Sequence, residues 1–142
     1  MVRKAVVTGI GIVSSLGDNA KEVLTSLKEC KSGISYSEEY AEKGFRSHVY
    51  GMPKIDLNDA LDRKNKRFMG DGAAYNYLSM EEAIADSGLS EEQVSHERTG
   101  LIMGSGGPST RNLIQAADTA RERGPKKVGP FMVPRTMSST NS

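Results

Sequence analysis

The chain has 142 residues, of which 37% are hydrophobic and 26% are charged, and its formal net charge is +1. A chain of this length fits one domain, and the balance is typical of a globular protein rather than a disordered one. The near-neutral charge excludes a general attraction to nucleic acid, and no stretch approaches the ~20 apolar residues of a membrane span. The single Cys30 excludes an internal disulfide and agrees with a reducing compartment, so we expect a cytoplasmic protein.

The first predicted elements are a strand and a helix. Residues 4–14 predict a strand with both faces covered, because β-branched residues dominate and polar alternation is almost absent. Asp18 or Asn19 is the expected N-cap of the helix, with Glu22 at capping-box spacing after Asn19. Gly33 stands where the left-handed residue after this helix is expected. The apolar stripe of the helix consists of Val23, Leu24, Leu27 and Cys30.

The middle of the chain combines irregular structure with one long helix. Residues 34–61 are interrupted by Gly and Pro, with a short strand expected around residues 47–50. The clearest helical spacing runs from Arg63 to Ser87, and Gly88 is expected to close that helix.

The last third of the chain predicts a strand, a helix and an extended segment. Residues 98–103 predict a second buried strand, and residues 109–122 predict a third helix that Gly124 and Pro125 stop. Residues 128–134 are expected to be extended and apolar, leading into a polar stub over residues 137–142.

The order strand, helix, helix, strand, helix predicts an α/β architecture with a mostly parallel sheet. Two strands cannot make a stable sheet of that kind. Further strands are therefore expected either in a continuation beyond Ser142 or in residues 34–61.

Two glycine-rich segments follow the predicted strands. Gly9-x-Gly11 lacks the third glycine of a dinucleotide fingerprint, because position 14 is serine, so we interpret it as a tight turn with close packing. Gly104-Ser105-Gly106-Gly107 lacks the Gly-Lys-Ser/Thr of a phosphate loop. Glycines after a strand allow a substrate or another backbone to approach, so a ligand-lining role and a packing role both stay open.

Basic residues form two clusters. Arg63-Lys64-Asn65-Lys66-Arg67 stands at the start of the long predicted helix, where the macrodipole disfavours each cation by about 0.3–1 kcal/mol. A negatively charged partner would explain that placement, and a solvated surface is the alternative. The second cluster surrounds the end of the third predicted helix, where cations are favourable and need no further explanation. Its members are Arg121, Arg123, Lys126 and Lys127.

No catalytic constellation is evident in the sequence. His48 and His96 have no partner at metal-ligand spacing, and Cys30 on its apolar stripe is expected to be a buried structural thiol rather than a nucleophile. No serine occupies a Gly-x-Ser-x-Gly elbow.

Several strings together resemble a known family. Residues 7–17, Val-Thr-Gly-Ile-Gly-Ile-Val-Ser-Ser-Leu-Gly, are similar to the N-terminal signature of β-ketoacyl-acyl-carrier-protein synthases. The likeness covers essentially the whole chain and is strongest to the type I, elongating branch. Its other strings are Ser32-Gly33-Ile34, Arg46-Ser47-His48-Val49, Asp62-Arg63-Lys64, Arg67-Phe68-Met69, Leu78-Ser79-Met80-Glu81, Ile84-Ala85-Asp86, Gly104-Ser105-Gly106-Gly107 and Val128-Gly129-Pro130-Phe131.

The resemblance implies a thiolase-like fold, a layered αβαβα structure of two related halves that works as a homodimer without a cofactor. Residues 1–142 would form the N-terminal part of the first half. In this family an acyl group moves from the phosphopantetheine of an acyl carrier protein to a cysteine, and malonyl carrier protein is then decarboxylated and condensed with it. The nucleophile and two histidines of relatives lie beyond the matched positions, so we expect the 142-residue chain alone to be inactive.

The resemblance also implies roles for individual residues. Arg63, Lys64 and Arg67 match basic positions that receive the acidic carrier protein, while Arg123 and Lys126 match positions that complete this surface for the neighbouring subunit. Gly107 matches a glycine of the acyl pocket. Met137, with Thr136 beside it, matches a residue that reaches into the partner's pocket, and the apolar segment 131–133 would belong to the dimer interface. A non-catalytic module that docks carrier proteins is the alternative function.

Overall fold

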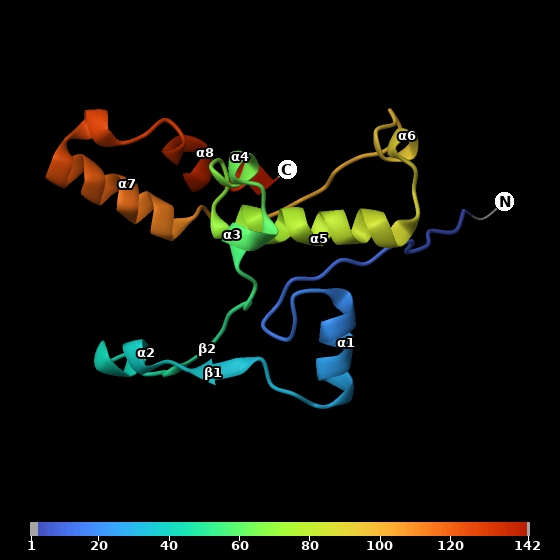
Figure 1. The fold of residues 1–142 in the computed structure, drawn as a ribbon, viewed down its shortest axis with the longest axis horizontal. Coiled ribbons are helices and arrows are strands. Elements are labelled where there is room, and N and C mark those ends of the chain that lie inside the picture. Colours follow the sequence, from blue (N-terminus) through green and yellow to red (C-terminus); the bar gives the residue numbers. More distant parts are fainter. Residues whose placement is uncertain (1–2, 142) are drawn as a thin grey trace. The chain divides into compact units, whose positions relative to one another are not determined.

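The computed structural model describes residues 3–141 (Figure 1). Met1, Val2 and Ser142, the last residue of the predicted stub, lie outside the described residues. The chain divides into two compact units. Unit 1 comprises Met1–Ile55 and Leu78–Leu89, and unit 2 comprises Asp56–Tyr77 and Ser90–Ser142. The long helix α5 (Asp71–Ser87) contributes to both units.

Unit 1 begins with an extended segment that lies along α5. The predicted strand over residues 4–14 is wrong, since the only bridge in this stretch is the isolated pair Ser14–Gly17. A strand needs a neighbouring strand to accept its amides, and here helix carboxylates take that place. The amide of Ile10 donates to Asp86 Oδ2 at 2.9 Å, and the amide of Ile12 donates to Glu82 Oε2 at 2.8 Å.

The glycines of this segment explain its close approach to α5. A Cβ atom at Gly9 would lie 2.1 Å from the carbonyl oxygen of Ala83, and one at Gly11 would lie 1.8 Å from that of Ser79. Both distances are far below van der Waals contact, so only glycine fits. The interpretation of Gly9-x-Gly11 as close packing is confirmed, and the packed partner is a helix.

Helix α1 (Ala20–Lys28) has the N-cap that its sequence predicts. Asn19 Oδ1 accepts the amide of Glu22 at 2.9 Å, and Glu22 Oε2 accepts the amide of Asp18 at 2.9 Å. The hydrogen bond from the Asp18 amide, and then the one from the Asn19 side chain, lower the pKa of Glu22 below its ordinary 4.5. Asn19 rather than Asp18 is therefore the cap.

The end of α1 differs from the prediction. The helix stops at Lys28, and the left-handed residue is Cys30, with φ 54°, not Gly33. The Cys30 amide donates to Leu27 O and the Lys31 amide to Ser26 O, which is a Schellman motif. Because this motif turns Cys30 away from the helix, its thiol is exposed, and the predicted buried thiol is wrong. Of the predicted stripe only Val23 is buried, and Leu24 and Leu27 remain 52% and 59% exposed.

The only sheet among residues 3–141 is a short antiparallel pair. Strand β1 (Ile34–Tyr36) pairs with β2 (Val49–Gly51), with Ser35 opposite Tyr50, and α2 (Glu38–Glu42) lies between them in the chain. The strand expected around residues 47–50 is confirmed, and the mostly parallel sheet is not formed within these residues.

The long helix predicted from Arg63 to Ser87 is broken. In unit 2, α3 (Leu57–Ala60) is followed by α4 (Arg63–Lys66), and α5 starts only at Asp71. Gly70, which is buried in the gap, would place a Cβ atom 2.9 Å from Arg135 O, so the chain bends where another segment crosses it. The predicted closure of α5 at Gly88 is confirmed by its φ of 66°.

The rest of unit 2 is helical. After α6 (Glu91–Val94), residues 98–103 form no strand, and Leu101 and Ile102 are 57% and 94% exposed, so the predicted buried strand is wrong. Helix α7 (Thr110–Arg123) is confirmed and ends at Gly124 with φ 86°, followed by the 3-10 turn η1 (Pro125–Lys127). Residues 128–134 are not extended throughout, because α8 (Met132–Thr136) starts within them and is followed by η2 (Ser138–Asn141).

The described residues have a small core. The buried apolar side chains are Val23 in unit 1 and Leu57, Leu61, Ala73 and Ala74 in unit 2. Apolar side chains of the two extended segments, such as Val7 and Ile102, stay exposed because no strand among residues 3–141 covers them. Among the described helices none has the length and apolar character needed to cross a bilayer.

Candidate functional site

All of the residues predicted to bind a carrier protein or an acyl chain lie in unit 2. Arg63 and Lys64 are exposed on α4, and Arg67 follows directly after it. Helix α4 has only four residues, and Asp62 Oδ1 caps it by accepting the Lys64 amide at 3.3 Å. The expected penalty for cations at the start of a long helix is therefore smaller than predicted, because a single capped turn has a weak dipole.

The cations of this cluster are held to different degrees. Lys66 Nζ donates to Asn58 Oδ1 on α3 at 2.6 Å, which turns Lys66 toward its own unit. Within the described part of the chain, no recorded ion pair involves Arg63, Lys64 or Arg67. These three side chains thus present positive charge that the described carboxylates do not neutralise. We call Arg63, Lys64 and Arg67 the basic patch.

Arg67 is fixed by two aromatic rings. Its Cζ atom lies 4.8 Å from the ring centroid of Phe68 and 5.0 Å from that of Phe131. The two rings meet edge to face, with centroids 5.1 Å apart and an interplanar angle of 87°. From α8, Arg135 Nε donates to the carbonyl oxygen of Arg67 at 2.9 Å. The position of Arg67 is consequently set by its neighbour Phe68 and by two residues more than sixty positions later, Phe131 and Arg135.

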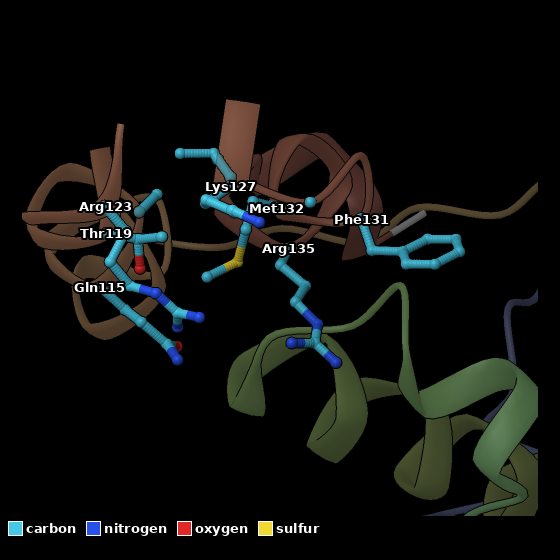
Figure 2. A pocket seen from close by; sticks show the side chains of 10 residues that line it. Gln115, Thr119, Arg123, Lys127, Phe131, Met132 and Arg135 are labelled. Carbon is cyan, nitrogen blue, oxygen red and sulfur yellow. The ribbon is translucent and has the colours of Figure 1, made fainter. Parts of the chain in front are cut away.

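A pocket of about 260 Å³ lies between α7 and α8 (Figure 2). Figure 2 shows Gln115, Thr119 and Arg123 of α7 on one side, with Met132 and Arg135 of α8 on the other. The remaining lining residues are Ala116, Lys127, Val128, Gly129 and Phe131. Arg123 therefore shares a cavity with Lys127 and Arg135, whereas Lys126 is exposed outside it.

A smaller pocket of about 110 Å³ brings Gly107 and Met137 together. Its other lining residues are Gly70, Gly72, Ala73, Ser105, Pro108, Ser109 and Arg135. A Cβ atom at Gly107 would meet no heavy atom of the described residues within 4 Å, so close packing among these residues does not require a glycine there. Thr136 is not part of this lining, and its Oγ1 donates to Val133 O at 2.9 Å.

The sequence pattern did not point to Phe68, Lys127 and Arg135 as site residues, and it assigned Phe131 only to an interface. Arg135 lines both pockets and also contacts Arg67. These contacts join segments far apart in the chain, so no local spacing could reveal them. The aromatic residue directly after Arg67 was the one available signal, because cations often stack on neighbouring rings.

The described residues contain no group of three or more His, Cys, Asp or Glu side chains that could hold a metal. His48 packs edge-on against Tyr36, with ring centroids 6.0 Å apart, and His96 Nδ1 accepts the amide of Arg98 at 3.1 Å. Both histidines thus have structural contacts. Unit 2 thus presents the basic patch and two small pockets.

Comparison with known proteins places these features in context. Residues 3–142 match the family model "Beta-ketoacyl synthase, N-terminal domain". The chain is 52% identical to 3-oxoacyl-[acyl-carrier-protein] synthase 1 of Haemophilus influenzae, over 99% of this chain and 35% of that protein. It is 51% identical to the enzyme of the same name from Escherichia coli K12, over 97% of this chain and 34% of that protein. The chain thus spans about a third of the length of these curated relatives.

Solved structures show the same architecture. A β-ketoacyl synthase from Burkholderia phymatum superposes with a TM-score of 0.75 at 27% identity, over 96% of this chain and 34% of that one. The ishigamide ketosynthase/chain length factor superposes with a TM-score of 0.79 at 20% identity, over the same shares of the two chains. The fold is therefore the N-terminal part of a thiolase-like ketosynthase, mixed in helix and sheet, as the resemblance implied.

Proposed function

Since the chain belongs to the β-ketoacyl synthase family, we propose that it is the N-terminal part of an acyltransferase that condenses acyl and malonyl groups on acyl carrier protein. The names of the curated relatives support this reaction, and the identity extends over nearly the whole chain. In this proposal residues 1–142 belong to the first thiolase-like half of a cytoplasmic homodimer, and the nucleophilic cysteine and two histidines are supplied by the rest of the protein.

The observation that carries the proposal is the basic patch. Arg63, Lys64 and Arg67 are exposed and unneutralised in the described structure, and an acidic carrier protein is a partner of opposite charge. Complementary charge accelerates encounter and fixes orientation more than it adds affinity. We assign Arg123 and Lys126 to completing the same docking surface for the neighbouring subunit. The pocket in which Arg123 meets Lys127 and Arg135 supports this for Arg123, and the exposure of Lys126 supports it for Lys126.

The smaller pocket supports a site for the acyl chain. Gly107 and Met137 line it, and the bare backbone at Gly107 leaves room for a ligand. Its volume of about 110 Å³ is below the ~300 Å³ at which ligand pockets usually begin. We therefore propose that these residues form one wall of a larger tunnel, and that Thr136 supports Met137 through its hydrogen bond to Val133 rather than touching the acyl chain.

Binding of fluorescently labelled holo acyl carrier protein, followed by anisotropy at several salt concentrations, tests the docking assignment. Arg63→Glu with Lys64→Glu should weaken binding at low salt and flatten its salt dependence, because surface charges are screened over ~10 Å at 0.1 M salt. Arg46→Glu with Lys54→Glu is the matched control, because it reverses one arginine and one lysine in the same way on two exposed residues of unit 1. Unchanged affinity in the double variant would refute the docking role.

An activity assay separates the enzyme from the alternative of a non-catalytic docking module. The purified 142-residue chain should bind carrier protein but form no ketoacyl product, and the protein extended by the remaining length of its relatives should form it. Product from the 142-residue chain alone, in a preparation free of longer enzyme, would contradict the proposal. Binding without product from the extended protein would favour the docking module.

A further inference from the structure

Arg67 differs from the other members of the basic patch because two aromatic rings hold its guanidinium group. We propose that Phe131 is a positioning residue for carrier-protein docking, which it aids by holding Arg67 in its binding orientation. This inference rests on the proposed function and adds to it a residue that does not itself carry charge.

The geometry fits a cation–π cluster. Both ring centroids lie within the ~6 Å at which a guanidinium is attracted to an aromatic face, at 4.8 Å for Phe68 and 5.0 Å for Phe131. The edge-to-face arrangement of the two rings is itself a favoured aromatic geometry. Phe131 therefore acts in two ways, because it contacts the cation directly and also orients the ring of Phe68.

The backbone of Arg67 is held by the same part of the chain as its side chain. Phe131 is the residue before α8, and Arg135 lies on α8 itself. The hydrogen bond from Arg135 Nε to Arg67 O ties the main chain at 2.9 Å, while Phe131 holds the side chain. In Figure 2 the guanidinium group of Arg135 points toward the green ribbon, which is the part of the chain that carries α3 and α4 in Figure 1. Phe131 and the adjoining helix α8 thus hold both the side chain and the main chain of Arg67.

Pre-positioning has a physical consequence for binding. A long cationic side chain loses rotamer freedom when it engages a carboxylate, and one that is already held loses less. Contact with the rings uses none of the hydrogen-bond donors of the guanidinium, so these donors stay free for the forked contact that carboxylates accept. A lysine at this position could also contact the rings, but its ammonium group lacks the forked donors of arginine.

The first test compares Phe131→Leu with Phe131→Tyr in the full chain, by the same anisotropy measurement of carrier-protein binding. Loss of the ring should weaken affinity about 2- to 5-fold, the equivalent of one exposed cation–π contact, and tyrosine should keep wild-type affinity. Phe45→Leu is the matched control, because Phe45 is an exposed phenylalanine that stacks on Tyr40 in unit 1. Far-ultraviolet circular dichroism checks that each variant is folded.

The decisive test repeats Phe131→Leu in an Arg67→Ala background. If Phe131 acts through Arg67, its loss should have no further effect there, whereas a purely structural role would weaken binding equally in both backgrounds. Equal losses would overturn the inference. So would an unchanged affinity for Phe131→Leu beside a weakened Arg67→Ala, and that result would leave the proposed docking function intact.

Two further outcomes are informative. If Arg67→Ala binds carrier protein as well as the wild type does, the docking role of Arg67 fails, and this inference fails with it. If Phe131→Leu does not fold, Phe131→Met replaces it, because it keeps a long apolar side chain but loses the ring. An affinity for Phe131→Met equal to that of the wild type would then contradict the role of the ring.

Discussion

Arg135 Nε donates a hydrogen bond of 2.9 Å to the carbonyl oxygen of Arg67, across a sequence separation of 68 residues. This contact connects the helix that lines both pockets to the residue on which carrier docking is proposed to depend. Helix α8, although it has only five residues, therefore both lines the two pockets and holds the main chain at Arg67.

Loss of this donor should loosen unit 2. For Arg135→Ala we expect a decrease of about 0.5–1.5 kcal/mol in the free energy of unfolding, because the Arg67 carbonyl loses its side-chain donor. Denaturant titration followed by circular dichroism measures the difference. Arg121→Ala is the control, since it removes only an exposed ion pair with Asp118 and should cost less than about 0.5 kcal/mol. Equal decreases in the free energy of unfolding for the two variants would contradict a stabilising role of the hydrogen bond from Arg135 to Arg67.

Gly11→Ala should destabilise unit 1. The added methyl group would lie 1.8 Å from the carbonyl oxygen of Ser79, so the extended segment would have to move away from α5, at a cost of about 1–3 kcal/mol. The amide of Ile12 would lose its contact with Glu82 at the same time. Gly100→Ala is the matched control, because a Cβ atom there meets nothing within 4 Å. Thermal unfolding of the two variants should differ, and equal midpoints would argue against the close approach.

The stability of unit 1 should fall in acid partly through Glu22. Hydrogen bonds from the Asp18 amide and the Asn19 side chain lower the pKa of Glu22 in the folded chain. A lowered pKa means that the stabilising contribution is present above the ordinary value of 4.5, and that it is lost as the pH falls through the folded value. Glu22→Gln should therefore flatten the decline in stability on the acid side. Urea titrations at neutral pH and at about pH 3 measure this, with Glu42→Gln on α2 as the control.

Cys30→Gly should stabilise α1. Cys30 has a φ of 54°, a conformation that costs a residue with a side chain about 1 kcal/mol and that glycine adopts freely. Part of the gain is offset by the greater freedom of glycine in the unfolded chain, so we expect an increase of about 0.5 kcal/mol in the free energy of unfolding. Cys30→Ala also removes the thiol but keeps the strain, so it should show no such gain. A Cys30→Gly variant no more stable than Cys30→Ala would contradict backbone strain as the cause.

Local features and family membership follow from the amino-acid sequence alone. The cap at Asn19 and the closures at Gly88 and Gly124 depend on neighbouring residues, so short-range chemistry predicts them. The short strings spread along the chain indicate the β-ketoacyl synthase family without reference to any contact in space, and the match of residues 3–142 to the family model confirms it.

Features that depend on a distant partner follow only from the packing of the folded chain. Residues 4–14 and 98–103 have the composition of strands, yet a strand exists only where a second one accepts its hydrogen bonds. The break before α5, the rings around Arg67 and the pairing of Gly107 with Met137 all join segments far apart in the chain. The spacing of residues along the sequence indicates the periodicity of one helix or strand. These contacts, in contrast, form only when separate elements pack together.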